Sequence, residues 1–421
     1  MDKVKLKYLT HCNVNKIYNI TNETINYIDI GSVSSDNKVN EIQSIPLDES
    51  PSRARRRIKT GDTIISTVRT YLKAIAYVSE EMNNYVCSTG FAVFSANNNL
   101  TSKYLYYSTL SIKFIDEISK KSVGVSYPAI NSSEIGNIKI CKPTLKNQEL
   151  VSNFLDFQLL DIDSLIFLKE KQIKLLEEQR QAMITEAVTK GLNPNVKMKD
   201  SGVDWIGEIP EHWEVKKIKH LSQVKRGASP RPIDDPKYYA VNGDYSWVRI
   251  SDVTKSGKYL FNTRDKLSEL GASKSVKRHR GDLFLSIAAT VGKACITKID
   301  CCIHDGFVYF DNLKVEEEYL FYIFEAGQCY RGLGKMGTQL NLNTDTVGNI
   351  TIPVSSRNEI QEIIDYITNK DVEFLNLINA VKRSKEKLKE YRQSLIHEAV
   401  TGKIPMEEME TYLKEVEKNG G

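Results

Sequence analysis

The chain contains one long helical pattern twice. Residues 180–189 read RQAMITEAVT, and residues 392–401 read RQSLIHEAVT. Seven of these ten positions are identical at a shift of 212 residues (392 − 180). An identity this dense at a fixed shift indicates internal duplication, which constrains the fold more than any other feature of the sequence.

An apolar residue recurs every seven residues in both copies, which predicts a coiled-coil seam. Each helix would have roughly 40 residues and span about 60 Å at 1.5 Å per residue. One alternative is two separate amphipathic helices, each packed on its own core. Equivalent seams favour two antiparallel helices that pack on each other. The predicted seam consists of Leu155, Ile162, Leu176, Met183, Ile367, Phe374, Val381, Leu388 and Leu395, and Lys169 interrupts the first copy.

The stretches between the helices have the pattern of mixed globular domains. In residues 1–146, short β-rich runs at 25–30, 63–68, 74–78, 86–94 and 138–141 are separated by polar turns, and 102–120 has a helical pattern. The expected order continues with a central helix over 147–192, a linker and second domain over 193–356, a distal helix over 357–402, and a charged tail over 403–421, which is expected to form a short surface helix.

The second domain repeats the framework of the first. Gly61-Asp62 matches Gly281-Asp282 at a shift of 220, and residues 136–138 match residues 348–350 at a shift of 212. The segments between the matched positions differ in length, as expected for two related modules that bind different ligands. We therefore predict an α+β protein with two similar α/β domains, two long antiparallel helices and a pseudo-two-fold internal repeat. The linker 193–213 carries two of the three tryptophans, so we expect it to dock on a surface.

Composition sets broad limits on the class of protein. The 421 residues are 41% hydrophobic and 27% charged, which is typical of a globular chain with two or three domains. A net charge of +4 permits a nucleic-acid partner without requiring one. Seven scattered cysteines without a CxxC pair indicate a reduced protein without a zinc site. No apolar signal core or membrane-length run is present, so we expect a cytoplasmic location.

The motifs that could indicate catalysis lack their structural context. Residues 332–337 fit GxGxxG, but a helical pattern precedes them and no helix start follows, so they predict a turn. Residues 235–238 resemble the Asp-Pro-Pro-Tyr of amino-methyltransferases, but Lys237 replaces the second proline. No phosphate loop occurs, and the six histidines do not cluster. We therefore expect no catalytic residue, metal or cofactor on this chain.

Basic clusters precede the same strand in both domains. A solvated face is the plain interpretation, but repetition at one framework position favours contacts with DNA phosphates or with guanine edges. The predicted DNA-binding residues are Arg53, Arg55, Arg56, Arg57, Lys59, Arg69 and Tyr71 in the first domain and Lys225, Arg226, Arg231, Arg249, Lys274, Lys277, Arg278, His279 and Arg280 in the second.

With these motifs in place, the chain resembles the specificity subunit of type I restriction–modification systems. The segment 200–213, which reads DSGVDWIGEIPEHW, is similar to the start of that family's target-recognition domains. The two Arg-Gln-x-x-Ile-x-Glu-Ala-Val-Thr helix ends resemble its central and distal repeats. The Gly-Asp strands and Gly337-Thr338-Gln339 also fit, and the resemblance covers nearly the whole chain. The first domain has no copy of the tryptophan segment, which leaves the docking of its N-terminus open.

The resemblance implies a DNA-binding subunit without catalysis of its own. Each domain would read one half of a bipartite, asymmetric site in double-stranded DNA. The helices would carry two modification subunits, which bind S-adenosylmethionine and methylate adenine at N6, and restriction subunits with ATP and Mg would be further partners. Two alternatives remain: a stand-alone two-headed scaffold protein with a coiled-coil spacer, and an enzyme with an unrecognised methyltransferase core.

Overall fold

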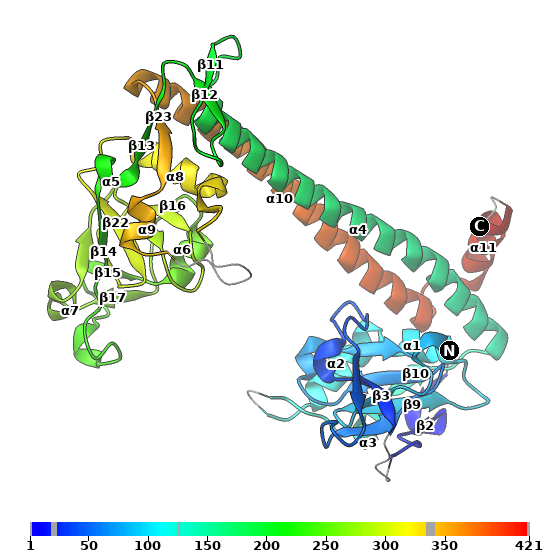
Figure 1. The fold of residues 1–421 in the computed structure, drawn as a ribbon. Coiled ribbons are helices and arrows are strands. Elements are labelled where there is room, and N and C mark those ends of the chain that lie inside the picture. The colour runs from blue at the N-terminus through cyan, green and yellow to red at the C-terminus, as the bar shows by residue number, and fades with distance from the viewer. Residues whose placement is uncertain (1, 18–22, 125–126, 334–341, 419–421) are drawn as a thin grey trace. The chain divides into compact units, whose positions relative to one another are not determined.

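The computed structural model describes residues 2–17, 23–124, 127–333 and 342–418 (Figure 1). The chain divides into two compact units. Unit 1 combines Met1–Glu170 with Lys382–Gly421, and unit 2 is the continuous stretch Lys171–Val381. Residues 334–337 of the GxGxxG motif, and Thr338 and Gln339 after it, lie outside the described residues.

Unit 1 contains two four-stranded sheets and one strand pair. The sheets have the strand orders β2-β9-β6-β7 and β4-β3-β8-β5, and β1 pairs with β10. The strand bounds are β1 Lys3–Lys5, β2 Thr10–Cys12, β3 Thr24–Ile28, β4 Gln43–Pro46, β5 Ala54–Arg57, β6 Thr63–Ser66, β7 Ile75–Tyr77, β8 Val86–Ser88, β9 Phe91–Ala96 and β10 Lys139–Cys141.

Unit 2 repeats this plan and adds a strand and a hairpin. Its sheets have the orders β14-β22-β19-β20-β16 and β17-β15-β21-β18, with the pairs β13-β23 and β11-β12. The strand bounds are β11 Met198–Asp200, β12 Glu208–Pro210, β13 Glu214–Lys217, β14 Gln223–Arg226, β15 Tyr245–Val248, β16 Tyr259–Leu260, β17 Asp265–Leu267, β18 Val276–Arg278, β19 Leu283–Ser286, β20 Ala294–Thr297, β21 Cys301–Ile303, β22 Phe307–Asp311 and β23 Thr351–Val354.

Helices cover these sheets, and two of them are long. The bounds are α1 Ser102–Thr109, α2 Ile112–Lys121, α3 Ser132–Gly136, α4 Leu145–Lys190, α5 Ile218–Leu221, α6 Ile250–Ser256, α7 Glu269–Ser273, α8 Glu317–Ala326, α9 Thr344–Gly348, α10 Arg357–Thr401 and α11 Met406–Lys418. Gly191 and Gly402 follow α4 and α10 with φ of +71° and +73°, the left-handed conformation that ends helices. Within the described residues, no helix is long and apolar enough to cross a membrane.

In each unit, α4 and α10 pack side by side and run in opposite directions. In unit 1, Asp163 pairs with Arg392 and Glu170 with Lys385. In unit 2, Ile173 packs with Ile378 and Val381. The structure buries the seam residues Leu155, Ile162, Ile367, Val381 and Leu395 and half-buries Leu176, Met183, Phe374 and Leu388. The predicted fold class, with two similar α/β domains, two long antiparallel helices and an internal repeat, is confirmed.

The duplicated helix ends dock on the globular part of each unit. Ile184 and Ile396, at the same position of the repeat, are both fully buried. The Tyr319 hydroxyl donates to the carbonyls of Val188 in α4 and Pro353 in β23, each at 3.1 Å. The repeat therefore preserves a docking surface, not only a coiled-coil seam.

Unit 1 contains the same arrangement of hydrogen bonds. The Tyr104 hydroxyl donates to the carbonyls of Val400 in α10, at 3.1 Å, and Cys141 in β10, at 3.2 Å. The Gln393 amide donates to the Leu110 carbonyl just after α1, as Gln181 does to the Ala326 carbonyl at the end of α8. These bonds explain why glutamine recurs in the two helix ends, whereas the recurring Val188 and Val400 have buried side chains.

The tryptophan linker, residues 193–213, packs on unit 2. Trp213 is fully buried, and the Trp205 indole donates to the Thr351 carbonyl at 3.1 Å. Ile206 and Ile209 join the same core. Figure 1 shows the hairpin β11–β12 of this linker beside β13 and β23. The linker is thus an integral part of the unit.

The structure refines three expectations about local structure. The run 86–94 is two strands, because the chain turns at Thr89-Gly90 and sends β8 and β9 into different sheets. The stretch 102–120 is two helices, because the Ser111 side chain caps a new helix by accepting from the Phe114 N–H. The tail helix α11 is not only a surface helix, since its Met409 is fully buried in the core of unit 1.

Candidate nucleic-acid interface

Both predicted basic clusters lie on or next to equivalent edge strands, β5 and β18. Each strand leads into the same turn, in which Gly61 and Gly281 have φ of +88° and +98°. The Asp62 carboxylate accepts from the Lys59 N–H at 2.8 Å, and Asp282 accepts from the His279 N–H at 2.8 Å. The repeated Gly-Asp is therefore a structural turn that holds the end of the basic strand in place.

The side chains of the first cluster differ in their availability to a ligand. Arg53 pairs with Asp29 at 3.0 Å, and Arg57 pairs with Glu23 at 2.9 Å. Arg56 is half-buried; burial lowers the pKa of its guanidinium, and its Nη1 has no hydrogen-bond acceptor in the described structure. Arg55 and the exposed Lys59 form no ion pair with any described residue, so they are the cations best placed to meet phosphates.

The second cluster divides in the same way. Arg278 is held by Asp282 at 3.0 Å and Asp311 at 3.2 Å, and only 16% of its side chain is exposed, so it stabilises the sheet. Lys277 is exposed and lies over the Tyr245 ring at 4.3 Å. His279 pairs with Asp300 at 3.1 Å. The exposed Lys274 and Arg280 have no ion-pair partner in the described part of the chain.

Two carboxylates gather further predicted cations in unit 2. Asp305 accepts from Ser229 at 2.6 Å and pairs with Arg231 at 2.9 Å, and its backbone carbonyl accepts from Arg226 at 2.6 Å. The Ser229 hydrogen bond and both arginines keep the pKa of Asp305 below its ordinary value. Arg231 remains 73% exposed, so this ion pair holds the guanidinium at the surface.

The second carboxylate, Asp311, holds Lys225 as well as Arg278. Lys225 pairs with Asp311 at 2.7 Å. Although burial alone would raise the pKa of Asp311, hydrogen bonds from Lys225 and Arg278 lower it. Arg249 pairs with Asp265 beside an open cleft of about 590 Å³. The structure thus brings Lys225 and Arg278 together on one carboxylate and leaves Arg249 apart from them.

The structure places Tyr127, which sequence reasoning missed, beside the predicted Arg69. The Arg69 guanidinium lies 5.1 Å from the centre of the Tyr127 ring. A bridge between Val68 and Ala129 joins the two loops. Tyr71 and Tyr127 are 56% and 66% exposed, so both rings could stack on bases. Tyr127 lies far from Arg69 in sequence, and no local motif marks this contact.

The motifs that could indicate catalysis have structural roles where they are described. Asp235 accepts from the Lys237 N–H in a short 3-10 turn, and Tyr238 is buried with its hydroxyl donating to the Arg231 carbonyl. Among the described residues, no group of three or more His, Cys, Asp or Glu side chains could hold a metal ion. Burial raises the pKa of the Cys87, Cys295 and Cys301 thiols to about 12, so these cysteines are protonated.

Comparison with known proteins places this chain in a family. A family model described as the type I restriction modification DNA specificity domain matches residues 3–178 and 210–388. The type I restriction enzyme MjaVIII specificity subunit of Methanocaldococcus jannaschii is 27% identical over 73% of this chain and 71% of its own length. The HindI specificity subunit of Haemophilus influenzae is 23% identical, and the match covers 90% of this chain and 94% of that protein.

A solved structure shares the fold. This structure comes from work on complex assembly and conformational transition of the type I R-M system. One of its chains is 22% identical to the present chain and superposes with a TM-score of 0.72. The match covers 95% of this chain and 97% of that chain. The family model matches two copies over most of the sequence, in agreement with the duplicated sheets and helix ends described above. The chain therefore belongs to the type I restriction–modification DNA specificity family, as a non-catalytic specificity subunit.

Proposed function

We propose that this chain reads a bipartite, asymmetric site in double-stranded DNA, with one half recognised by each α/β domain. The observation that carries the proposal is the pair of equivalent strands β5 and β18, which end in the same Gly-Asp turn and present exposed cations. Lysine and arginine side chains neutralise phosphates and supply most of the affinity for DNA. Base contacts in the grooves then supply specificity.

The differences between the two domains support recognition of two different half-sites. Unit 1 places Arg69 beside Tyr127 in its loops, whereas unit 2 holds Arg231 on Asp305. These side chains differ in reach and hydrogen-bonding pattern, so they would contact different bases. The shared sheets supply the common framework, and the loops supply the sequence preference.

The proposal assigns the chemistry to partner proteins. Two modification subunits would bind S-adenosylmethionine and methylate adenine at N6, while this chain positions them on the DNA. Restriction subunits, with ATP and Mg, would be further partners. An exposed face of α4 supports this part of the proposal, because its Phe167 and Leu168 are 65% and 56% exposed. Apolar side chains exposed together on a helix are typical of a protein contact.

The test is DNA affinity as a function of salt, measured on the complex with modification subunits. Arg55→Ala with Lys59→Ala should lower the slope of log affinity against log salt by roughly two, about one for each phosphate that the variant no longer neutralises. The matched control is Arg57→Ala, whose guanidinium is already paired with Glu23 and should change the slope less. If the double variant binds with unchanged affinity and slope, β5 is only a solvated strand.

Competition between ligands separates this function from that of a stand-alone scaffold. Duplex DNA carrying the methylated motif should displace labelled DNA, whereas RNA of equal length should not. Sequencing of genomic methylation should give two short motifs with an unread gap. Equal competition by RNA would refute recognition of duplex DNA.

A further inference from the structure

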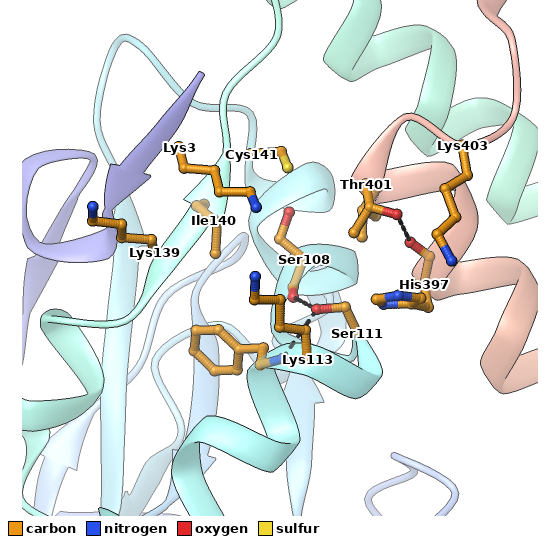
Figure 2. Close-up of a pocket in the computed structure, with 12 residues that line it drawn as sticks. Lys3, Ser108, Ser111, Lys113, Lys139, Ile140, Cys141, His397, Thr401 and Lys403 are labelled. Carbon is orange, nitrogen blue, oxygen red and sulfur yellow. Dashed lines mark hydrogen bonds between the residues drawn. The ribbon is translucent and has the colours of Figure 1, made fainter. Parts of the chain in front are cut away.

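Unit 1 contains a pocket of about 320 Å³ away from the basic strand β5. Its walls are the β1–β10 pair, the region where α1 passes into α2, and the end of α10. Figure 2 shows side chains from all three walls around the space. None of the predicted DNA-binding residues lines this pocket.

The pocket is strongly basic. Lys3, Lys113, Lys139 and Lys403 line it, and no carboxylate appears among the described lining residues. In Figure 2 the ammonium ends of Lys3 and Lys113 lie near each other, the ammonium of Lys403 lies beside His397, and Lys139 points away. None of the four lysines forms an ion pair with a described residue. Like charges held together without a counter-ion repel one another, so a bound anion would stabilise the arrangement.

Two polar atoms at the pocket wall lack hydrogen-bond partners. Ser108 is 2% exposed, and its hydroxyl lies beside the Tyr104 hydroxyl without a hydrogen bond of good geometry to any described group. His397 is half-buried, and its Nδ1 atom is buried without a hydrogen-bond partner among the described residues. Buried polar atoms are nearly always satisfied in folded proteins, so two unsatisfied atoms beside one cavity indicate a missing ligand. A ligand oxygen could accept from the serine hydroxyl and from an imidazole N–H.

The equivalent place in unit 2 lacks three of these lysines and has linker tryptophans beside it. At a shift of 212, Lys3 corresponds to Val215, Lys139 to Thr351 and Lys403 to Gly191. There the Trp205 indole bonds to the Thr351 carbonyl, and a Cβ on Gly191 would come within 3.1 Å of the Trp213 ring. The duplicated scaffold is therefore stable without lysines here, and the charge is specific to unit 1.

We propose that this pocket binds a phosphate group. Phosphate carries up to two negative charges and several acceptor oxygens, which suits the ammonium groups of Lys3, Lys113 and Lys403 together with the Ser108 hydroxyl. The phosphate group comes either from free phosphate and nucleotides or from a nucleic-acid backbone. The inference does not depend on DNA recognition through β5.

Calorimetry with inorganic phosphate on the full chain tests the site. Lys113→Ala with Lys403→Ala should weaken phosphate binding by at least about ten-fold, because hydrogen bonds to charged groups are among the stronger ones. Lys121→Ala, an exposed lysine of the same α2 helix that does not line the pocket, is the control and should bind like the wild type. The variant Lys113→Gln with Lys403→Gln repeats the test with polar side chains. The proposal is overturned if the wild type does not bind phosphate, or if the wild type and both double variants bind it with equal affinity.

The titration of His397 gives a second readout. Burial lowers the pKa of its imidazole; Lys403 and Lys113 add to this effect, whereas Glu398 and Asp116 oppose it. Saturation with phosphate places negative charge beside the ring, so the pKa of His397 should rise when followed by NMR. An unchanged His397 pKa at saturating phosphate would place the phosphate elsewhere and refute the assignment.

Two further arms identify the source of the phosphate group. If a nucleoside triphosphate competes with phosphate, and the double alanine variant binds DNA like the wild type, the pocket binds a free ligand. A DNA salt slope that falls by about two in that variant assigns the pocket to the nucleic-acid backbone. Either result supports the phosphate site, and the Arg55 and Lys59 test remains independent of both.

Discussion

Removal of the repeated arginine should have unequal effects in the two units. Arg180 pairs with Glu325 at 3.1 Å and with Asp371, whose side chain is only 13% exposed. Arg392 pairs with Asp163 at 2.8 Å, and the Asp163 side chain is 33% exposed. Arg180→Ala leaves Asp371 buried without its cation, which should cost about 3–5 kcal/mol. Arg392→Ala leaves a partly hydrated carboxylate, which should cost about 1 kcal/mol.

Urea unfolding followed by circular dichroism measures both effects. Each unit has its own core, so the curves are fitted with one transition for each unit if two are resolved. Asp371→Ala added to Arg180→Ala should recover part of the lost stability, because it removes the unpaired carboxylate. Lys293 still pairs with Glu325 at 3.1 Å, so Glu325 does not dominate the result. Equal losses for Arg180→Ala and Arg392→Ala would refute the argument from burial.

Three further predictions concern stability. Tyr319→Phe and Tyr104→Phe should each lower the free energy of unfolding in urea by about 1–3 kcal/mol, because buried carbonyls lose their hydrogen-bond donor. Losses below about 0.5 kcal/mol would contradict the role of these hydroxyls in docking the helix ends. Gly202→Ala should lower the free energy of unfolding by about 1 kcal/mol, because Gly202 has a φ of +68°. Gly191→Ala should lower it more, because a Cβ there also meets the Trp213 ring at 3.1 Å. Equal shifts of the melting temperature in the two variants would argue against that contact. Burial lowers the pKa of His304, with Asp305 opposing and Arg249 adding, so the unfolded chain binds a proton more readily. The stability of unit 2 should therefore fall as pH drops through about 6.5 and level off below the folded pKa. Thermal unfolding at several pH values should show this loss reduced in His304→Asn, and an unchanged pH profile would contradict it.

The sequence predicted those features that rest on periodicity. The seven-residue pattern identified the seam because Leu155, Ile162, Ile367, Val381 and Leu395 recur at coiled-coil spacing. The docking role of the repeat could not be predicted in this way. Gln393 bonds to Leu110 and Tyr319 to Val188, and these hydrogen bonds join residues that are distant in the chain. Local patterns carry no information on such pairs.

The sequence predicted where positive charge gathers at the candidate interface, but not which of these cations are free to bind DNA. A run such as residues 53–59 shows where cations gather. Whether each cation is free depends on carboxylates elsewhere in the sequence, such as Glu23 for Arg57 and Asp311 for Arg278. The phosphate pocket has the same origin, since Lys3 and Lys403 meet only after both ends of the chain reach unit 1. These features arise from tertiary structure.

The division of the chain into a continuous and a discontinuous unit has a consequence for synthesis on the ribosome. Unit 2 is complete when residue 381 leaves the exit tunnel, but unit 1 also needs residues from Lys382 onward, which are made 212 residues (382 − 170) after Glu170. At roughly 5–20 residues per second, this wait lasts about 10–40 s. Until then the apolar side chains of Leu155 and Ile162 lack Leu395 and Ile396 against which to pack. A nascent chain that stalls in this interval would present that surface to chaperones or to another nascent chain.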